Sequence, residues 1–401
     1  MRTYAQALPA MIPVMHALFL SSFGPCKRQT LPRRLLPLAR ALAARGHEVG
    51  LLIPAWDCPQ SEARGQRSEV GGQVGEVRVI VPELGLGGGG VYPQLLGRLQ
   101  RQIRAFEPDI LFVSKGLGYA GRAGRWWMKQ GGQIVVDVDD LEPAWHREAG
   151  RNRLAAWLLT RQEAALIRDA TGVIFASHFL LAYYRHIRTQ HPKRPLASLP
   201  YYLPNGLIPA ASRAPVEANP PRALLLTRGH DVDAGALVQV WTQTVARVPQ
   251  AELLIAGGWT PPQPLPQTRV LGWLPPDRYT QTIRSAAVCL FTPTKKPLVQ
   301  AKSPARVLDC LAQGVPVLTL DVGEYAALVR EGGGEPAPDE AELIARLQQL
   351  LTAPQARGRA GQEAFAGITP LHWDRRAASL ETWLLQLKPE PSQAPLHPRL
   401  R

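Results

Sequence analysis

The sequence predicts an α/β protein of two doubly wound parallel-sheet domains that face each other across a cleft. Short apolar runs alternate with longer amphipathic segments along most of the 401 residues. Several of these runs are continuously apolar, which is typical of strands that helices cover on both faces. The alternation stops at a proline-rich stretch, residues 211–222, and then starts again. We therefore expect two sheets joined by a linker, with ligands bound at the carboxyl ends of the strands.

In the first half of the chain, each expected strand is a short run rich in Leu, Ile, Val or Phe. These strands are expected at residues 17–22, 47–54, 77–83, 109–114, 133–140 and 172–177. Helices with an apolar stripe are expected between them, at residues 31–46, 92–108, 121–132 and 153–170. A glycine-rich loop, LGLGGGG, follows the third strand, and YYLPNGLIP (201–209) is predicted to interrupt the rhythm.

The second half repeats the pattern. Strands are expected at residues 222–229, 251–258, 268–275, 287–294 and 315–321, and helices at 236–249, 277–286, 303 onward, 339–352, 356–366 and 372–388. The predicted organisation is an extension at 1–14, a first domain at 15–205, a second domain at 206–371, a last helix at 372–388 and a disordered tail at 389–401. Residues 8–20 resemble the apolar part of a signal peptide, but MHALFLSSFG from Met15 fits a first buried strand better.

Composition favours a reduced, cytoplasmic protein. The chain is 45% hydrophobic and 19% charged, which is ordinary for globular domains. No uncharged apolar run is long enough to span a bilayer. Its four cysteines show neither CxxC spacing nor histidine partners at metal-site distances, so we expect buried thiols and no bound metal.

Most of the formal net charge of +14 lies in residues 1–210. A basic first half suggests that this domain meets an anionic partner, either a membrane surface or an acidic acceptor. An arginine-rich genome would explain the same excess without any partner. No RNA-binding motif or aromatic–basic platform indicates nucleic acid.

The stretch AKSPARVLD (301–309) predicts a phosphate site. Ser303 is a good N-cap and Pro304 suits the first position of a helix, whose free amides and dipole attract a diphosphate. Lys302 lies just outside this end, and Arg306 lies one turn inside, facing either the ligand or solvent. An ordinary capped helix after a strand is the alternative.

Seven segments together resemble a retaining glycosyltransferase of family 4, the large group 1 type, over roughly residues 15–385. They are LARALAARGHEVGLLIP (38–54), VVDVDDLE (135–142), RDATGVIFAS (168–177), LPNG (203–206), PQAELLIAGG (249–258), VLGWLP (270–275) and AKSPARVLDCLAQGVPVLTLDVGEY (301–325). The resemblance implies the GT-B fold, two Rossmann-like domains. It also implies that the first domain binds the acceptor, the second binds a nucleotide sugar, and the last helix braces the first domain.

The same resemblance assigns ligand contacts. It implies that Asp309, where relatives usually have Glu, accepts hydrogen bonds from the ribose, and that Arg228 clamps the diphosphate at a strand end. Gly229 lets the backbone approach a ligand closely, and Gly257 leaves room for the nucleotide; a plain turn is the alternative for Gly257. Trp273 is expected to serve packing and not a ligand contact.

Two positions depart from the family pattern. Ala301 stands where relatives have a sugar-binding Glu, and Asp233 stands where they have a Lys. We expect Lys302 to replace the lost charge and Glu324, in the loop after strand VPVLTLD, to replace the lost carboxylate. The alternative is weak binding or lost catalysis. The first loop, from Phe23 to Arg28, keeps one glycine and carries a basic pair for an acidic acceptor or for solvent.

Asp139 is the remaining catalytic candidate. It falls where relatives have a His near the sugar, and Asp137 and Asp140 lie beside it at a strand end. It would bond a sugar hydroxyl or the acceptor; a metal site and a purely structural cluster are the alternatives. Arg228, Lys302 and the helix start would stabilise the leaving diphosphate without a metal or a side-chain nucleophile.

The sequence thus favours a hexosyltransferase that uses a nucleotide-diphosphate sugar as donor substrate, needs no further cofactor and acts on a glycan or lipid-linked acceptor. Cell-envelope glycan synthesis at the inner membrane face would suit these features. Two other hypotheses stay open: a GT-B scaffold that has lost catalysis, and a basic surface-binding protein.

Overall fold

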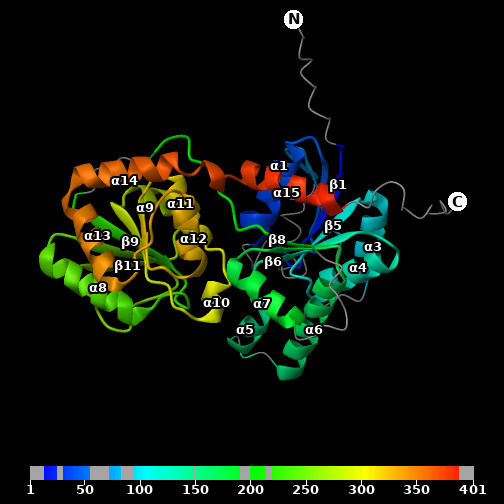
Figure 1. Cartoon of the computed structure of the whole chain (residues 1–401), viewed down its shortest axis with the longest axis horizontal. Coiled ribbons are helices and arrows are strands. Elements are labelled where there is room, and N and C mark those ends of the chain that lie inside the picture. The colour runs from blue at the N-terminus through cyan, green and yellow to red at the C-terminus, as the bar shows by residue number, and fades with distance from the viewer. Residues whose placement is uncertain are drawn as a thin grey trace, which may run out of the picture.

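A computed structural model describes residues 13–24, 30–54, 72–82, 94–148, 150, 152–189, 199–213 and 219–387. It shows two α/β domains side by side, each built on its own mostly parallel sheet (Figure 1). The expected fold class is therefore confirmed as GT-B. Residues 1–12, the glycine-rich loop LGLGGGG and the tail from residue 388 lie outside the described residues.

The first sheet has the order β3-β4-β2-β1-β5-β6-β7-β8, and all neighbours are parallel except β3 and β4. Its strands are β1 (His16–Leu20), β2 (Glu48–Leu52), β3 (Gly72–Val74), β4 (Val77–Ile80), β5 (Ile110–Ser114), β6 (Ile134–Val138), β7 (Gly172–Phe175) and β8 (Leu199–Tyr202). The central strands are buried on both faces, and the stacked rings of Phe19 and Phe112 lie 4.3 Å apart between β1 and β5. This explains why their sequences are continuously apolar.

Helices cover both faces of this sheet: η1 (Leu31–Leu35, a π-helical turn), α1 (Leu36–Ala43), α3 (Leu95–Phe106), α4 (Gly118–Lys129), α5 (Glu142–Glu148), α6 (Arg153–Asp169) and α7 (His178–Thr189). Sequence analysis did not predict α5 or α7. The expected interruption at 201–209 was partly wrong, because residues 199–202 pair with β7 as β8.

The second sheet is entirely parallel, with the order β11-β10-β9-β12-β13. Its strands are β9 (Arg222–Thr227), β10 (Glu252–Gly257), β11 (Thr268–Gly272), β12 (Val288–Phe291) and β13 (Val317–Thr319). Its helices are α8 (Ala234–Arg247), α9 (Pro276–Arg284), α10 (Pro297–Gln300), α11 (Ala305–Ala312), α12 (Gly323–Glu331), α13 (Glu340–Thr352) and α14 (Pro354–Ala366). One apolar core, from Leu207 to Leu371, fills this domain.

The chain then returns to the first domain through the short turn η2 (Thr369–Leu371) and α15 (Trp373–Leu387). Figure 1 shows α15 crossing from the second domain to lie beside α1. Trp383 stacks on Tyr201 with ring centroids 4.9 Å apart, and Glu381 accepts hydrogen bonds from Arg45 and His47. The last helix is thus part of the first domain's core, while the domain boundaries drawn from sequence stay predictions.

Among the described residues, no helix is both long and apolar enough to cross a lipid bilayer.

Replacing Trp383 with Ala should destabilise the first domain by about 3–5 kcal/mol, because the ring is 7% exposed and packs directly over Gly172. Urea unfolding followed by circular dichroism measures this loss. Trp157→Ala removes an indole that is 51% exposed and should change the free energy of unfolding by less than about 0.5 kcal/mol. Equal effects of the two changes would contradict the bracing role of α15.

Candidate functional site

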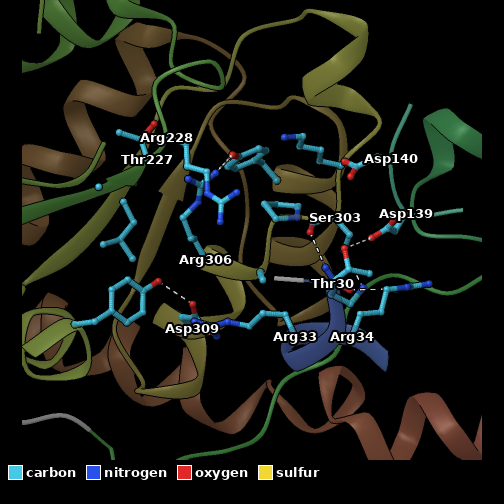
Figure 2. Close-up of a pocket in the computed structure, with 18 of the residues that line it drawn as sticks. Thr30, Arg33, Arg34, Asp139, Asp140, Thr227, Arg228, Ser303, Arg306 and Asp309 are labelled. Atoms are coloured by element: carbon cyan, nitrogen blue, oxygen red, sulfur yellow. Dashed lines mark hydrogen bonds and ion pairs between the residues drawn. The ribbon is translucent and has the colours of Figure 1, made fainter. Parts of the chain in front are cut away.

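A cavity of about 630 Å³ lies between the domains, at the carboxyl ends of both sets of strands. Figure 2 shows Thr30, Arg33, Arg34 and Asp139 on one side and Arg228, Arg306 and Asp309 on the other. Since parallel strands direct their carboxyl ends to one edge of a sheet, the two-domain arrangement brings polar side chains from distant segments together here.

Helix α11 begins at Ala305, and Pro304 occupies its N-cap position without a capping side chain. The prediction that Ser303 caps this helix is therefore wrong. Its hydroxyl accepts a hydrogen bond of 2.8 Å from the backbone N–H of Asn205, whose side-chain Nδ2 donates to the Ser303 carbonyl. Ser303 and Pro304 both line the cavity, so the start of α11 lies beside it. No side chain of the described residues caps the first amides of this helix.

Arg306 lines the cavity from the first turn of α11 and is held by Asp231. Asp231 also accepts hydrogen bonds from the hydroxyls of Tyr325 (2.8 Å) and Thr227 (2.7 Å). Burial alone would raise the pKa of Asp231, but Arg306 and these hydroxyls hold it well below its usual range. Arg306 Nη1 is buried and makes no hydrogen bond within the described chain, which leaves a donor for a ligand. Sequence analysis missed Asp231, although it closely follows a strand end.

Lys302 contacts both domains. Its Nζ lies 2.7 Å from His230 Nε2 and 4.2 Å from the ring centroid of Trp145, which belongs to α5. Burial and the Lys302 charge lower the pKa of His230 to about 4, so this imidazole is neutral at pH 7 and its Nε2 accepts a hydrogen bond from the Lys302 ammonium group. Burial also lowers the pKa of Lys302, with Asp140 opposing that effect. The cavity therefore holds a partly desolvated ammonium group.

Arg228 follows β9 and lines the cavity, with its guanidinium 5.8 Å from the ring centroid of Trp273. Trp273 packs against Gly258, as expected, although it is 69% exposed and also lines the cavity. Gly257 lines the cavity, and a Cβ at this position would lie 1.8 Å from the carbonyl oxygen of Thr227 in the adjacent strand β9. This position therefore requires glycine for contact with β9. Gly229 has a φ of +96° and packs against Trp259, outside the cavity lining.

Asp309 lies on the cavity side of α11 and already has two partners. Its Oδ2 accepts a hydrogen bond of 2.7 Å from the Tyr279 hydroxyl, and its Oδ1 lies 2.6 Å from Arg33 Nη1 of the first domain (Figure 2). An ion pair thus crosses the cleft at the carboxylate for which the sequence predicts a ribose contact. Sequence analysis identified neither partner.

The first-domain wall is a lysine surrounded by carboxylates. Lys115 Nζ lies 2.7 Å from Asp139, 2.6 Å from Asp140 and 2.9 Å from Glu142. Burial would lower the pKa of Lys115, but the three carboxylates raise it well above its usual value. Burial, aided by Asp140 and opposed by Lys115, raises the pKa of Asp139 to about 6. Lys115 was missed in the sequence, although it directly follows β5.

Glu324 does not reach this cavity. It lies in the first turn of α12 and not in a loop, and it accepts hydrogen bonds from the His178 backbone N–H (2.6 Å) and the Tyr202 hydroxyl (2.7 Å). Its carboxylate is buried at the contact between the domains. The expectation that Glu324 replaces the missing sugar-binding carboxylate therefore disagrees with the structure.

The two positions that depart from the family pattern have local roles. Asp233 is the N-cap of α8 and accepts a hydrogen bond of 3.1 Å from the Ala236 N–H. Ala301 is fully buried against the apolar core of the first domain. Neither lines the cavity.

Comparisons with known proteins agree with this architecture. Residues 32–195 match the family model described as Glycosyltransferase Family 4, and residues 237–382 match the model described as Glycosyl transferase-like. No curated protein matches the sequence.

Solved structures resemble the chain at low sequence identity. Sucrose-phosphate synthase from Thermosynechococcus elongatus has 19% identity and a TM-score of 0.62, covering 92% of this chain and 98% of its own. HepE from Anabaena, solved with UDP and glucose, has 13% identity and a TM-score of 0.60, covering 93% and 100%. WaaG, a glycosyltransferase involved in lipopolysaccharide biosynthesis, has 14% identity and a TM-score of 0.57, covering 92% and 99%.

Two parallel-sheet domains enclosing a cationic cavity define a protein of the GT-B class. The matches to a Glycosyltransferase Family 4 model in the first domain and to a Glycosyl transferase-like model in the second indicate, at this coarse level, a glycosyltransferase.

The raised pKa of Asp139 predicts a pH-dependent stability. The folded chain holds the Asp139 proton up to about pH 6, whereas an unfolded aspartate loses it near pH 4. The free energy of unfolding should therefore fall as the pH rises across this interval. Asp139→Asn cannot titrate, so its stability relative to the wild type should rise from pH 4 to pH 6 and then level off. Urea unfolding at a series of pH values measures this difference, and a constant difference would contradict the assignment.

Proposed function

We propose that the protein transfers a sugar from a nucleoside-diphosphate sugar to a glycan or lipid-linked acceptor, with retention of configuration. One observation carries this proposal: Arg228, Lys302, Arg306 and the uncapped start of α11 all border one interdomain cavity. Cationic side chains and free helix amides are the groups that bind diphosphates in proteins. The solved relative from Anabaena was crystallised with UDP and glucose, which supports a donor of this class.

In this proposal the donor lies along α11. Its diphosphate meets the helix start and the three cations, and its ribose hydroxyls meet Asp309 one turn further along. The sugar then faces the first-domain wall, where Asp139 accepts a hydrogen bond from the sugar or the acceptor. The order of these groups along α11 supports the placement, since positions 305, 306, 309, 312 and 313 all line the cavity.

The proposed reaction breaks the bond between the anomeric carbon and the diphosphate oxygen while the acceptor oxygen bonds to the same carbon. The departing phosphate takes the acceptor proton, so the attack occurs on the face that the leaving group vacates. Arg228, Lys302 and Arg306 stabilise the negative charge that develops on the leaving group. Because these cations can neutralise it, the proposal assigns no role to a metal ion or to a side-chain nucleophile.

We infer the class of acceptor and the cellular location from the net charge of the first half of the chain. The excess of basic residues in the first half suits an anionic acceptor or an anionic membrane surface. We place the protein in the cytoplasm, at the inner membrane face, in the synthesis of a cell-envelope glycan. The fold shared with WaaG, which acts in lipopolysaccharide biosynthesis, supports this setting.

A second candidate is a GT-B protein that binds nucleotides without catalysis. It is favoured by Ala301 and Asp233, whose side chains serve packing and helix capping and do not line the cavity. A thermal-shift panel of nucleoside diphosphates tests binding, and transfer or hydrolysis of radiolabelled nucleotide sugars tests catalysis. Binding without turnover of any donor would favour this second candidate. An absence of nucleotide binding would favour a basic surface-binding protein.

Lys302→Ala should weaken nucleoside-diphosphate binding roughly tenfold, because a partly desolvated ammonium group is removed from the cavity. Isothermal titration calorimetry measures the affinity. Lys296→Ala removes an exposed lysine of the same domain, outside the cavity lining, and should leave the affinity unchanged. Equal affinities of the wild type and Lys302→Ala would remove Lys302 from the site.

Asp309→Ala should weaken binding of a ribonucleoside diphosphate but not of its 2′,3′-dideoxy analogue, because only the former has hydroxyls to donate to the carboxylate. Affinities of both ligands for both proteins form a double-mutant cycle that isolates this contact. A loss of the same size for both ligands would show that Asp309 acts on the cavity through Arg33 and Tyr279 and not on the ribose.

A further inference from the structure

Helix α6 exposes three large apolar side chains on one face. Leu154, Trp157 and Leu158 have exposed fractions of 65%, 51% and 54%. Their spacing of three and four residues places them next to one another on the first two turns. The buried side of the same helix, at Leu166 and Ile167, packs in the first domain's core. The exposed residues are therefore not needed to fold the helix onto its sheet.

The charges around this face are mainly positive. Arg153 and Arg161 are exposed at either end of it, and the Arg161 guanidinium lies 4.8 Å from the ring centroid of Trp157. Arg147 at the end of α5 is also exposed, and Glu148 is the one exposed acid that the structure describes between positions 147 and 161. Leu and Trp flanked by arginine suit the boundary between lipid headgroups and acyl chains.

The exposed apolar face of α6 lies near the helix that lines the cavity. Helix α5, which immediately precedes α6, lines the cavity through Glu142, Trp145 and His146. Helices α5 and α6 contact each other and lie together at the lower edge of the first domain (Figure 1). Since both follow the carboxyl end of β6, the start of α6 lies on the same side of the sheet as the cavity.

We propose that the first two turns of α6 bind the surface of an anionic lipid bilayer, with Leu154, Trp157 and Leu158 inserted among the headgroups. The flanking arginines contact the anionic lipids. A second copy of the chain fits this face less well, because a two-fold contact through it would bring the same arginines of both copies together. The acceptor would then reach the cavity from the bilayer past α5, a corollary that rests on the proposed function.

Vesicle sedimentation with the full chain tests the surface. Vesicles of phosphatidylcholine mixed with phosphatidylglycerol should bind the wild type, and pure phosphatidylcholine vesicles should bind it much less. The double variant Leu154→Ser/Leu158→Ser should lose on the order of tenfold in partitioning or more, since two apolar side chains no longer insert. Leu199→Ser/Val270→Ser, which changes two exposed apolar residues elsewhere, is the matched control and should bind like the wild type.

Two results would overturn the proposal. The first is equal vesicle binding by the wild type and the α6 variant. The second is that the wild type does not bind anionic vesicles, while light scattering shows a wild-type dimer that the α6 variant no longer forms. The nucleoside-diphosphate thermal shift, measured on the same proteins, should be the same in all of them. If wild-type vesicle binding depends on α6 but no nucleotide produces a shift, the surface assignment stands and the proposed function fails.

Discussion

The site depends on a chain of hydrogen bonds that begins at the buried guanidinium of Arg34. This side chain binds Asp137 at the end of β6 through two nitrogens and donates from Nη1 to the Asn205 side chain at 3.1 Å. Asn205 in turn donates to the hydroxyl and carbonyl oxygens of Ser303, directly before α11. A strand end of one domain is thereby connected to a helix start of the other. Because a buried charge left without its partner is costly, this connection fixes how the two walls of the cavity face each other.

The fold was predictable because the information lies in local pattern. Continuous apolar runs predicted strands such as β5 and β12, and amphipathic spacing predicted α3 and α15. Site residues were predictable only where a charged residue directly follows an expected strand or directly precedes an expected helix. Arg228 is an example of the first case and Lys302 of the second. Ser303 was misassigned because its partner, Asn205, is 98 positions away. Lys115 and Arg33 were missed for the same reason, since their partners lie in other segments of the chain.

The two positions that depart from the family pattern, Ala301 and Asp233, have structural roles in this chain. Asp233 caps a helix and Ala301 fills a gap between apolar side chains, so each has a sufficient structural reason of its own. The cavity nevertheless contains two fixed cationic side chains. Arg306 is held by the buried Asp231, and Lys302 is held between His230 and Trp145. Among the described residues that line the cavity, Asp309 is the carboxylate of the second domain, and Asp139, Asp140 and Glu142 come from the first.

The ion pair between Arg33 and Asp309 joins the two walls of the cavity at a carboxylate that could also bind ligand hydroxyl groups. Any ligand whose hydroxyl groups bond to Asp309 competes with a guanidinium that belongs to the other domain. A ligand bound to Asp309 would therefore weaken one contact between the two walls of the cavity, and by reciprocity a weaker contact would favour ligand binding. Arg33 is 45% exposed, so solvent can take over its hydrogen bonds when the tie is broken. The same carboxylate thus serves both the contact between the domains and the proposed ligand site.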